Sequence, residues 1–148
     1  MKKIVILTLA IFTAGFMSMS CSSDDEGGGI KATDLLGRWE FARAGQLVNG
    51  QEVYEDYQHE TGCPKDFLQL NSDFTGRVDT FSADGEGNCD VDSMALTLWS
   101  LSGNRFTSTS DGVTESSEIV SVTASSMKVK SVESDGTFFT TYTRPSAN

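Results

Sequence analysis

The chain has 148 residues, and its 21 acidic residues exceed its 11 lysines and arginines, which gives a formal net charge of −10. This acidity argues against binding to nucleic acid and against adhesion to anionic lipid headgroups. The length suits a single domain with one hydrophobic core, and we expect that domain to be monomeric.

The first twenty residues have the three-part layout of an export signal. Met1-Lys2-Lys3 is a positively charged start, residues 4–16 are mainly apolar, and Ser18-Met19-Ser20 supplies small residues before Cys21. The apolar run is shorter than the roughly 20 residues that a transmembrane helix needs. The segment ending in Cys21 resembles the lipobox of bacterial lipoproteins, with serine where leucine is usual at position 18. This resemblance implies cleavage before Cys21 and acylation of that cysteine; an ordinary secretory signal is the alternative.

The residues after Cys21 are polar, acidic and rich in glycine, which is the composition of a flexible tether. We therefore divide the chain into a signal peptide at 1–20, a lipidated cysteine and tether at 21–32, and a domain at 33–145. Cleavage removes Lys2 and Lys3, so 9 basic residues remain against 21 acidic ones and the formal charge becomes −12.

Acidic residues close behind the cysteine resemble the surface-export signal of some Gram-negative lipoproteins. The expected location is the outer membrane, on the cell surface or on the periplasmic face. The lipid is expected to be the only contact with the membrane, and it anchors stably when two or more fatty chains insert.

Cys63 and Cys89 remain once Cys21 is assigned to lipid. An even pair in an exported chain meets an oxidising compartment, so a disulfide between them is expected. Closing a loop of about 26 residues contributes on the order of 3 kcal/mol to stability. Metal or redox roles fit poorly, because the chain has no Cys-x-x-Cys motif and a single histidine.

Helical periodicity is confined to one predicted turn at 32–36. Short runs of β-branched, aromatic and aliphatic residues between Gly, Asn, Asp and Ser predict strands instead. The predicted strands are Gly37–Ala44, Gln51–Tyr57, Phe67–Asn71, Gly76–Phe81, Met94–Leu101, Arg105–Thr109, Thr114–Thr123, Ser126–Val132 and Thr137–Arg144. Eight or nine successive strands predict an all-β meander that closes into a small antiparallel up-and-down eight-stranded barrel. A two-sheet sandwich is the alternative.

Leu36-Gly37-Arg38-Trp39 resembles the Gly-x-Trp opening strand of lipocalins and of the wider calycin group. Cys63-Pro64-Lys65-Asp66, Cys89, the segment 99–106 and the final Tyr142-Thr143-Arg144 match in order, so residues 33–144 resemble the lipocalin-like domains of Gram-negative lipoproteins. The resemblance implies a barrel with a central cavity. It also implies a structural motif in which Arg144 packs across Trp39, next to Gly37. Because the chain is short for a lipocalin, the cavity is expected to be small or filled.

No catalytic motif stands out, and we expect a non-enzymatic protein without a cofactor. His59, the one histidine, is interpreted as a solvated loop residue among acids. Residues 83–93 carry acidic or amide side chains at every second place, as a calcium loop does. The EF-hand pattern needs glycine at its sixth position and glutamate at its twelfth, where Cys89 and Ala95 stand. A solvated loop is therefore expected there, with an irregular calcium site as the alternative.

Aromatic side chains are the candidate ligand contacts, with ordinary core packing as their competing role. The candidates are Phe67, Phe81, Trp99, Phe106, Phe138 and Tyr142. The leading hypothesis is a lipid-anchored module that binds a small apolar or amphipathic ligand at the cell envelope. The alternative is a filled barrel whose loops contact another protein or a glycan. An enclosed apolar cavity favours the first, and a solid interior with an exposed aromatic patch favours the second.

Overall fold

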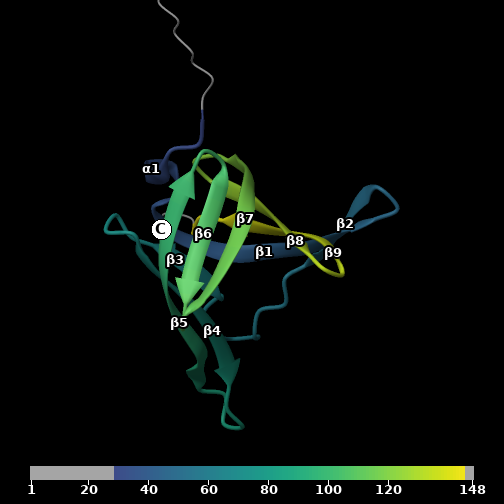
Figure 1. The fold of residues 1–148 in the computed structure, drawn as a ribbon. Coiled ribbons are helices and arrows are strands. Elements are labelled where there is room, and N and C mark those ends of the chain that lie inside the picture. Colours follow the sequence, from purple (N-terminus) through teal and green to yellow (C-terminus); the bar gives the residue numbers. More distant parts are fainter. Residues whose placement is uncertain (1–28, 146–148) are drawn as a thin grey trace, which may run out of the picture.

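The computed structural model describes residues 29–145, which form one helical turn and nine antiparallel strands (Figure 1). The elements are α1 (Ala32–Leu35), β1 (Gly37–Val48), β2 (Gln51–Asp56), β3 (Phe67–Leu70), β4 (Thr75–Ala83), β5 (Cys89–Ser102), β6 (Arg105–Ser110), β7 (Val113–Val122), β8 (Ser126–Glu133) and β9 (Gly136–Thr143). The predicted strands agree with these nine. Cys21, the signal peptide and most of the tether lie outside the described residues.

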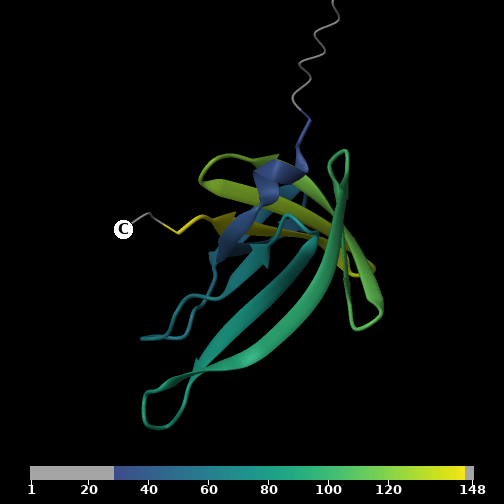
Figure 2. The same cartoon turned by 90° about the vertical axis from the view of Figure 1, so that its left-hand side faces the viewer.

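β5 differs most from its predicted range, because it begins five residues before Met94. The β4–β5 ladder continues to the pair Ala83–Cys89, so the two strands form a long hairpin (Figure 2). Residues 90–94 of β5 are all exposed. Since neither face of this part of β5 is buried, the sequence has no apolar alternation there that would predict a strand.

Eight of the strands close a barrel. Neighbours pair in the order β1-β3-β4-β5-β6-β7-β8-β9, and β9 pairs back with β1. This closure confirms the predicted eight-stranded antiparallel barrel over the sandwich. β2 stands outside the circle, because it pairs only with the second half of β1.

β2 and β3 occupy the same edge of β1, and an insertion separates them. Arg43 is paired with Asp56 of β2, whereas Glu40 is paired with Phe67 of β3. If the register of β2 continued along β1, residue 59 would lie opposite Glu40. Phe67 occupies that place instead, eight residues later in the chain. We call residues 57–66 the insertion, since they interrupt what would otherwise be one strand along β1.

The hydrophobic core lies at the end of the barrel that α1 covers. Its buried members are Leu35, Trp39, Leu70, Trp99, Ile119 and Met127. The indole Nε1 of Trp39 donates a hydrogen bond of 2.7 Å to the carbonyl oxygen of Leu35, which holds α1 over the barrel. Ile30 and Ala32, which were predicted to belong to the tether, pack against this core. The packed domain therefore starts before the predicted residue 33.

The barrel divides along two seams at its other end. β7 and β8 pair only from Val122–Met127 to Glu118–Lys130. Beyond the Glu118–Lys130 pair, β7 remains paired with β6 and β8 with β9. The second seam begins where β1 leaves β3, at Glu40. Figure 1 shows the result, with β4–β7 diverging from β1, β2, β8 and β9. Within the described part of the chain, no helix has the length and apolar character that crossing a bilayer requires.

Candidate ligand-binding site

The interior of the barrel contains a cavity of about 310 Å³ next to the core. Seven of the eight barrel strands contribute to its wall. Within a strand the lining residues are two positions apart, because successive side chains point to opposite faces of a sheet. The aliphatic and aromatic lining residues are Leu68, Leu70, Val78, Ala95, Phe106, Ile119, Met127, Val129 and Tyr142. The polar lining residues are Thr97, Ser108, Ser110, Glu115, Ser117, Ser131 and Thr140.

The cavity has an apolar floor and a polar mouth. On β7, the inward side chains change from buried Ile119 through Ser117 to exposed Glu115. On β8, they change from buried Met127 through Val129 to Ser131. Both strands therefore become polar towards the open seam. An apolar pocket with a few polar groups at one end suits a ligand with an apolar body and a polar head.

The seam between β7 and β8 opens beside this mouth. Its last ladder pair, Glu118 and Lys130, also forms an ion pair between the two side chains. One step further, the hydroxyl of Ser131 donates to the hydroxyl oxygen of Ser117 at 3.3 Å. The described β7–β8 ladder does not extend past these residues, so the two strands separate beside the polar end of the cavity.

The seam along β1 is bridged by a buried carboxylate of the insertion. Asp66 is 5% exposed, and its two oxygens accept hydrogen bonds of 2.9 Å from the backbone N–H of Phe81 and from the hydroxyl of Tyr57. Burial of the phenol, and next this bond to Asp66, raise the pKa of Tyr57 to about 12. The carboxylate thus ties the insertion to β4.

His59 belongs to the same network and is not the solvated residue that the sequence predicted. Its Nδ1 accepts a hydrogen bond of 3.1 Å from the backbone N–H of Asp66, so the proton of the neutral ring is on Nε2. Nε2 then donates to the carbonyl oxygen of Phe41 at 2.8 Å. Both ring nitrogens bind main chain, which makes His59 a bridge between the insertion and β1 and leaves neither nitrogen free to bind a substrate.

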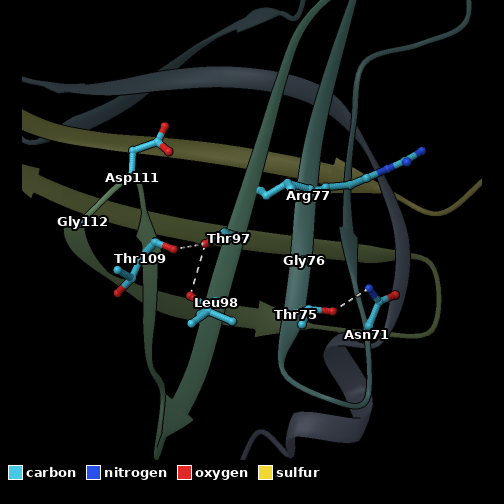
Figure 3. A pocket seen from close by; sticks show the side chains of 10 residues that line it. Asn71, Thr75, Gly76, Arg77, Thr97, Leu98, Thr109, Asp111 and Gly112 are labelled. Carbon is cyan, nitrogen blue, oxygen red and sulfur yellow. Dashed lines mark hydrogen bonds between the residues drawn. The ribbon is translucent and has the colours of Figure 1, made fainter.

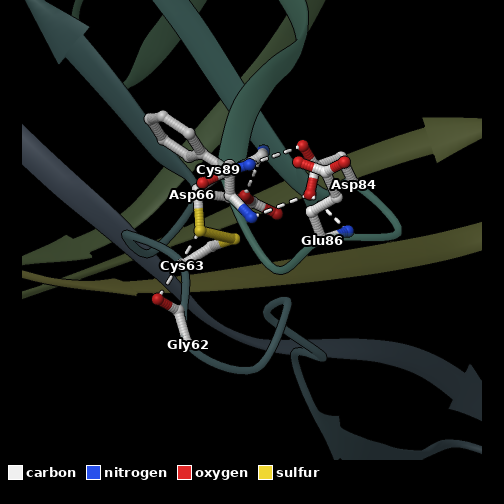
Figure 4. Close-up of a disulfide and its surroundings, with 8 residues drawn as sticks. Gly62, Cys63, Asp66, Asp84, Glu86 and Cys89 are labelled. Carbon is white, nitrogen blue, oxygen red and sulfur yellow. Dashed lines mark hydrogen bonds between the residues drawn. A yellow bond between two sulfur atoms is a disulfide. The ribbon is translucent and has the colours of Figure 1, made fainter.

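The predicted disulfide is confirmed and reinforces this seam (Figure 4). Cys63 of the insertion is bonded to Cys89 at the start of β5. In the adjoining β4–β5 turn, Asp84 accepts 2.8 Å hydrogen bonds from the backbone N–H groups of Glu86 and Asn88. Hydrogen bonds from Asn88 are the largest cause that lowers the pKa of Asp84. Residues 29–145 contain no group of three or more side chains placed to hold a metal ion.

The six candidate aromatic residues are spread over four surroundings. Phe106 and Tyr142 line the cavity. Trp99 is buried in the core, with its Nε1 donating to the carbonyl oxygen of Thr75 at 3.0 Å. Phe138 lines a separate hollow beside β1 and β2. Phe67 and Phe81 pack against each other elsewhere. The expectation of ligand contact in this cavity is therefore corrected for Phe67, Phe81, Trp99 and Phe138, which do not line it.

Phe67 shows the reason for this correction. Its ring is covered by the guanidinium group of Arg38, whose central carbon is 3.9 Å from the ring centroid. The sequence alone cannot tell which face of a strand turns inward when both faces carry apolar residues. It also missed the hydroxyl residues and Glu115 in the cavity wall. The signal for these was a polar residue at every second place following Phe106 in β6, at Ser108 and Ser110, and preceding Ile119 in β7, at Glu115 and Ser117.

The motif of Gly37, Trp39 and Arg144 is present at the closed end. The central guanidinium carbon of Arg144 is 3.9 Å from the centroid of the Trp39 ring. Gly37 has a φ of +106°, and a Cβ placed there would lie 2.8 Å from Nη1 of Arg144. A larger residue at position 37 would be strained and would displace the arginine.

A second hollow, of about 510 Å³, lies on the outside of β4, β5 and β6 (Figure 3). Leu96 and Leu98, which line it, are 65% and 63% exposed, and Met94 on the same side of β5 is 58% exposed. We call these three residues the β5 strip. Unlike the interior cavity, this hollow is a feature of the solvated surface.

The closed eight-stranded barrel and its internal cavity place this chain in the class of small antiparallel β-barrel proteins whose interior can hold one small ligand. The family model described as a lipocalin-like domain matches residues 35–129, and the chain belongs to this family. The structure is similar to that of a lipocalin-like protein from Bacteroides uniformis ATCC 8492, with 12% sequence identity and a TM-score of 0.50. That similarity covers 76% of this chain and 99% of the other. At this identity it shows the fold alone. No curated protein matches the sequence.

Proposed function

We propose that this chain is a lipid-anchored binding protein of the cell envelope that holds a small apolar or amphipathic ligand inside its barrel. The observation that carries the proposal is the cavity of about 310 Å³, which has an apolar floor and a polar mouth beside the point where β7 and β8 stop pairing. Its volume is at the lower end of the range typical of ligand pockets. The role is binding without catalysis.

The test uses a bulky substitution inside the barrel and a matched one outside it. Ser108 lines the cavity, whereas its neighbour Thr107 bonds to Ser116 and does not line it. The polypeptide 22–148 is exported behind a secretory signal, so that it forms its disulfide without being acylated. Binding is followed through the fluorescence of N-phenylnaphthylamine, a neutral apolar probe, and native mass spectrometry searches for a co-purified ligand.

Ser108→Phe is expected to reduce probe affinity at least about tenfold, because the phenyl ring occupies the volume that the probe needs. Thr107→Phe is expected to bind as the unmodified chain does. Equal probe binding by both variants, each with a cooperative unfolding transition, would contradict binding in the cavity.

The exposed β5 strip supports a second candidate function, in which the domain contacts a protein or a glycan. An apolar surface of this kind is a feature of interaction sites. This candidate predicts that Leu96→Ser and Leu98→Ser abolish association with a partner but leave probe binding unchanged. It becomes the better proposal if the probe does not bind to the unmodified chain.

A further inference from the structure

The charge and hydrogen-bonding capacity of the cavity mouth restrict the head group of the ligand. We propose that the cavity selects an amphipathic cation, with an ammonium-type head at Glu115 and an apolar body on the floor formed by Ile119 and Met127. This inference rests on the function proposed above and names the class of ligand.

Glu115 is the charged member of the cavity lining in the described part of the chain. It lies in β7 directly opposite Ser108 of β6, and both side chains face the cavity. Directly opposed residues have Cβ atoms about 5 Å apart. A head group that contacts the hydroxyl of Ser108 is therefore close to the carboxylate of Glu115.

Three hydroxyl groups of the cavity lining, those of Thr97, Ser110 and Ser131, already donate their protons within the protein. Ser110 donates its proton to the carbonyl oxygen of Leu96 at 2.8 Å, and Ser131 donates to Ser117 at 3.3 Å. The single hydroxyl proton of Thr97 is shared between the carbonyl oxygens of Leu98 and Thr109, each 3.2 Å from its oxygen. The three donating hydroxyls keep lone pairs for a ligand, whereas Ser108 and Ser117 can donate as well as accept.

An ammonium group has three donors and no acceptor, so it matches the carboxylate of Glu115 together with the lone pairs of the neighbouring hydroxyl groups. A carboxylate head is acceptor-only and would also be repelled by Glu115. Lys130, at the β7–β8 seam, does not reverse the preference for a cationic head group, because its ammonium group is paired with the carboxylate of Glu118.

The overall acidity of the chain is the competing explanation for any preference for cations. A field summed over many exposed charges is screened by salt, with a Debye length of about 3 Å at 1 M. A contact between the head group and Glu115 is screened less. The contribution of Glu115 can therefore be separated from that of the overall acidity in two ways: by adding salt, and by comparing removal of the Glu115 charge with removal of a distant charge.

The experiment measures displacement of N-phenylnaphthylamine from the polypeptide 22–148 by decylammonium, decanol and decanoate. These three compounds share one apolar body and differ in head-group charge. Decylammonium is expected to bind tightest and decanoate weakest, by about fivefold or more, also at high salt. Glu115→Gln should reduce that ratio to near one, and Glu115→Lys should invert it.

Glu86→Gln is the matched control, because Glu86 is exposed at the tip of the β4–β5 hairpin and does not line the cavity. It removes the same formal charge and should leave the ratio unchanged. The inference is overturned if decanoate binds as tightly as decylammonium, or if Glu86→Gln changes the ratio as much as Glu115→Gln does. Failure of all three compounds and of the probe to bind would instead overturn the proposed binding function itself.

Discussion

The guanidinium group of Arg144 stacks on the indole of Trp39 and joins the end of the last strand to the start of the first. Its central carbon is 3.9 Å from the ring centroid. Its two terminal nitrogens donate to the carbonyl oxygens of Leu36 at 2.8 Å and Asp34 at 3.0 Å. One side chain thus fastens β9, β1 and α1 together at the closed end of the barrel.

Replacing Arg144 should destabilise the barrel measurably. Arg144→Met keeps much of the aliphatic packing but loses two hydrogen bonds from a charged group and the contact with the ring. We expect a loss of about 2–4 kcal/mol in the free energy of unfolding, measured by urea denaturation. Arg144→Lys should recover only part of it, because an ammonium group does not reproduce the planar geometry of the guanidinium.

Trp39→Ala tests the other partner of this contact. Trp39 is fully buried, and truncation of a large core side chain costs about 3–5 kcal/mol. A negligible change in the unfolding midpoint would contradict a structural role for the pair. If Arg144 acts through Trp39, the loss caused by Arg144→Met should be smaller in the Trp39→Ala background.

Removing the disulfide should loosen one seam of the barrel. The Cys63–Cys89 bond spans 26 residues, and a loop of that length corresponds to about 3 kcal/mol in the chain-entropy estimate. The double variant Cys63→Ala, Cys89→Ala should unfold at lower urea, and its amide hydrogens in the insertion should exchange faster than those around Trp39. Thiol labelling of the native chain should leave both cysteines unreactive; labelling of either would contradict the bond.

The hydrogen bond between Tyr57 and Asp66 should appear as an alkaline loss of stability. Burial and this bond raise the pKa of Tyr57 from 10.0 to about 12 in the folded state. The folded chain therefore keeps a proton that the unfolded chain has lost, so this contribution is complete below pH about 10 and disappears as the pH rises towards 12.

Tyr57→Phe isolates this contribution in urea unfolding across the same pH range. Burial also raises the pKa of Tyr142, so part of the alkaline decline should remain in the variant. The decline should nevertheless be shallower than in the unmodified chain. Parallel pH dependences for the two chains would show that Tyr57 does not titrate with folding.

Lipid anchoring is tested at Cys21, which is outside the described residues. Cys21→Ala should prevent acylation, because the substituted side chain has no thiol to carry a fatty chain. With a general secretory signal in place of residues 1–20, the exported variant should fractionate apart from membranes, whereas the native precursor should yield a membrane-bound product. Continued membrane association of the cleaved Cys21→Ala variant would contradict the proposed anchor.

The sequence predicted the strands well where one face is buried and a turn follows. Met127 and Val129 alternate with lysines, and Asn49-Gly50 marks the β1–β2 turn. It failed at the first part of β5, where successive residues on both faces of the strand are exposed. The role of His59 was also hidden, because its partners are main-chain groups brought to it by the insertion.

By itself, the sequence determined the antiparallel strand succession and the pairing of Cys63 with Cys89, because periodicity, turn residues and an even cysteine count are local or countable properties. The tertiary structure alone decided which side chains face the barrel interior. Strand register turns Ser108 and Glu115 inward and excludes Phe67, and no property of the individual residues reveals that choice. The open β7–β8 seam likewise depends on where two distant strands stop pairing, which only the closed barrel establishes.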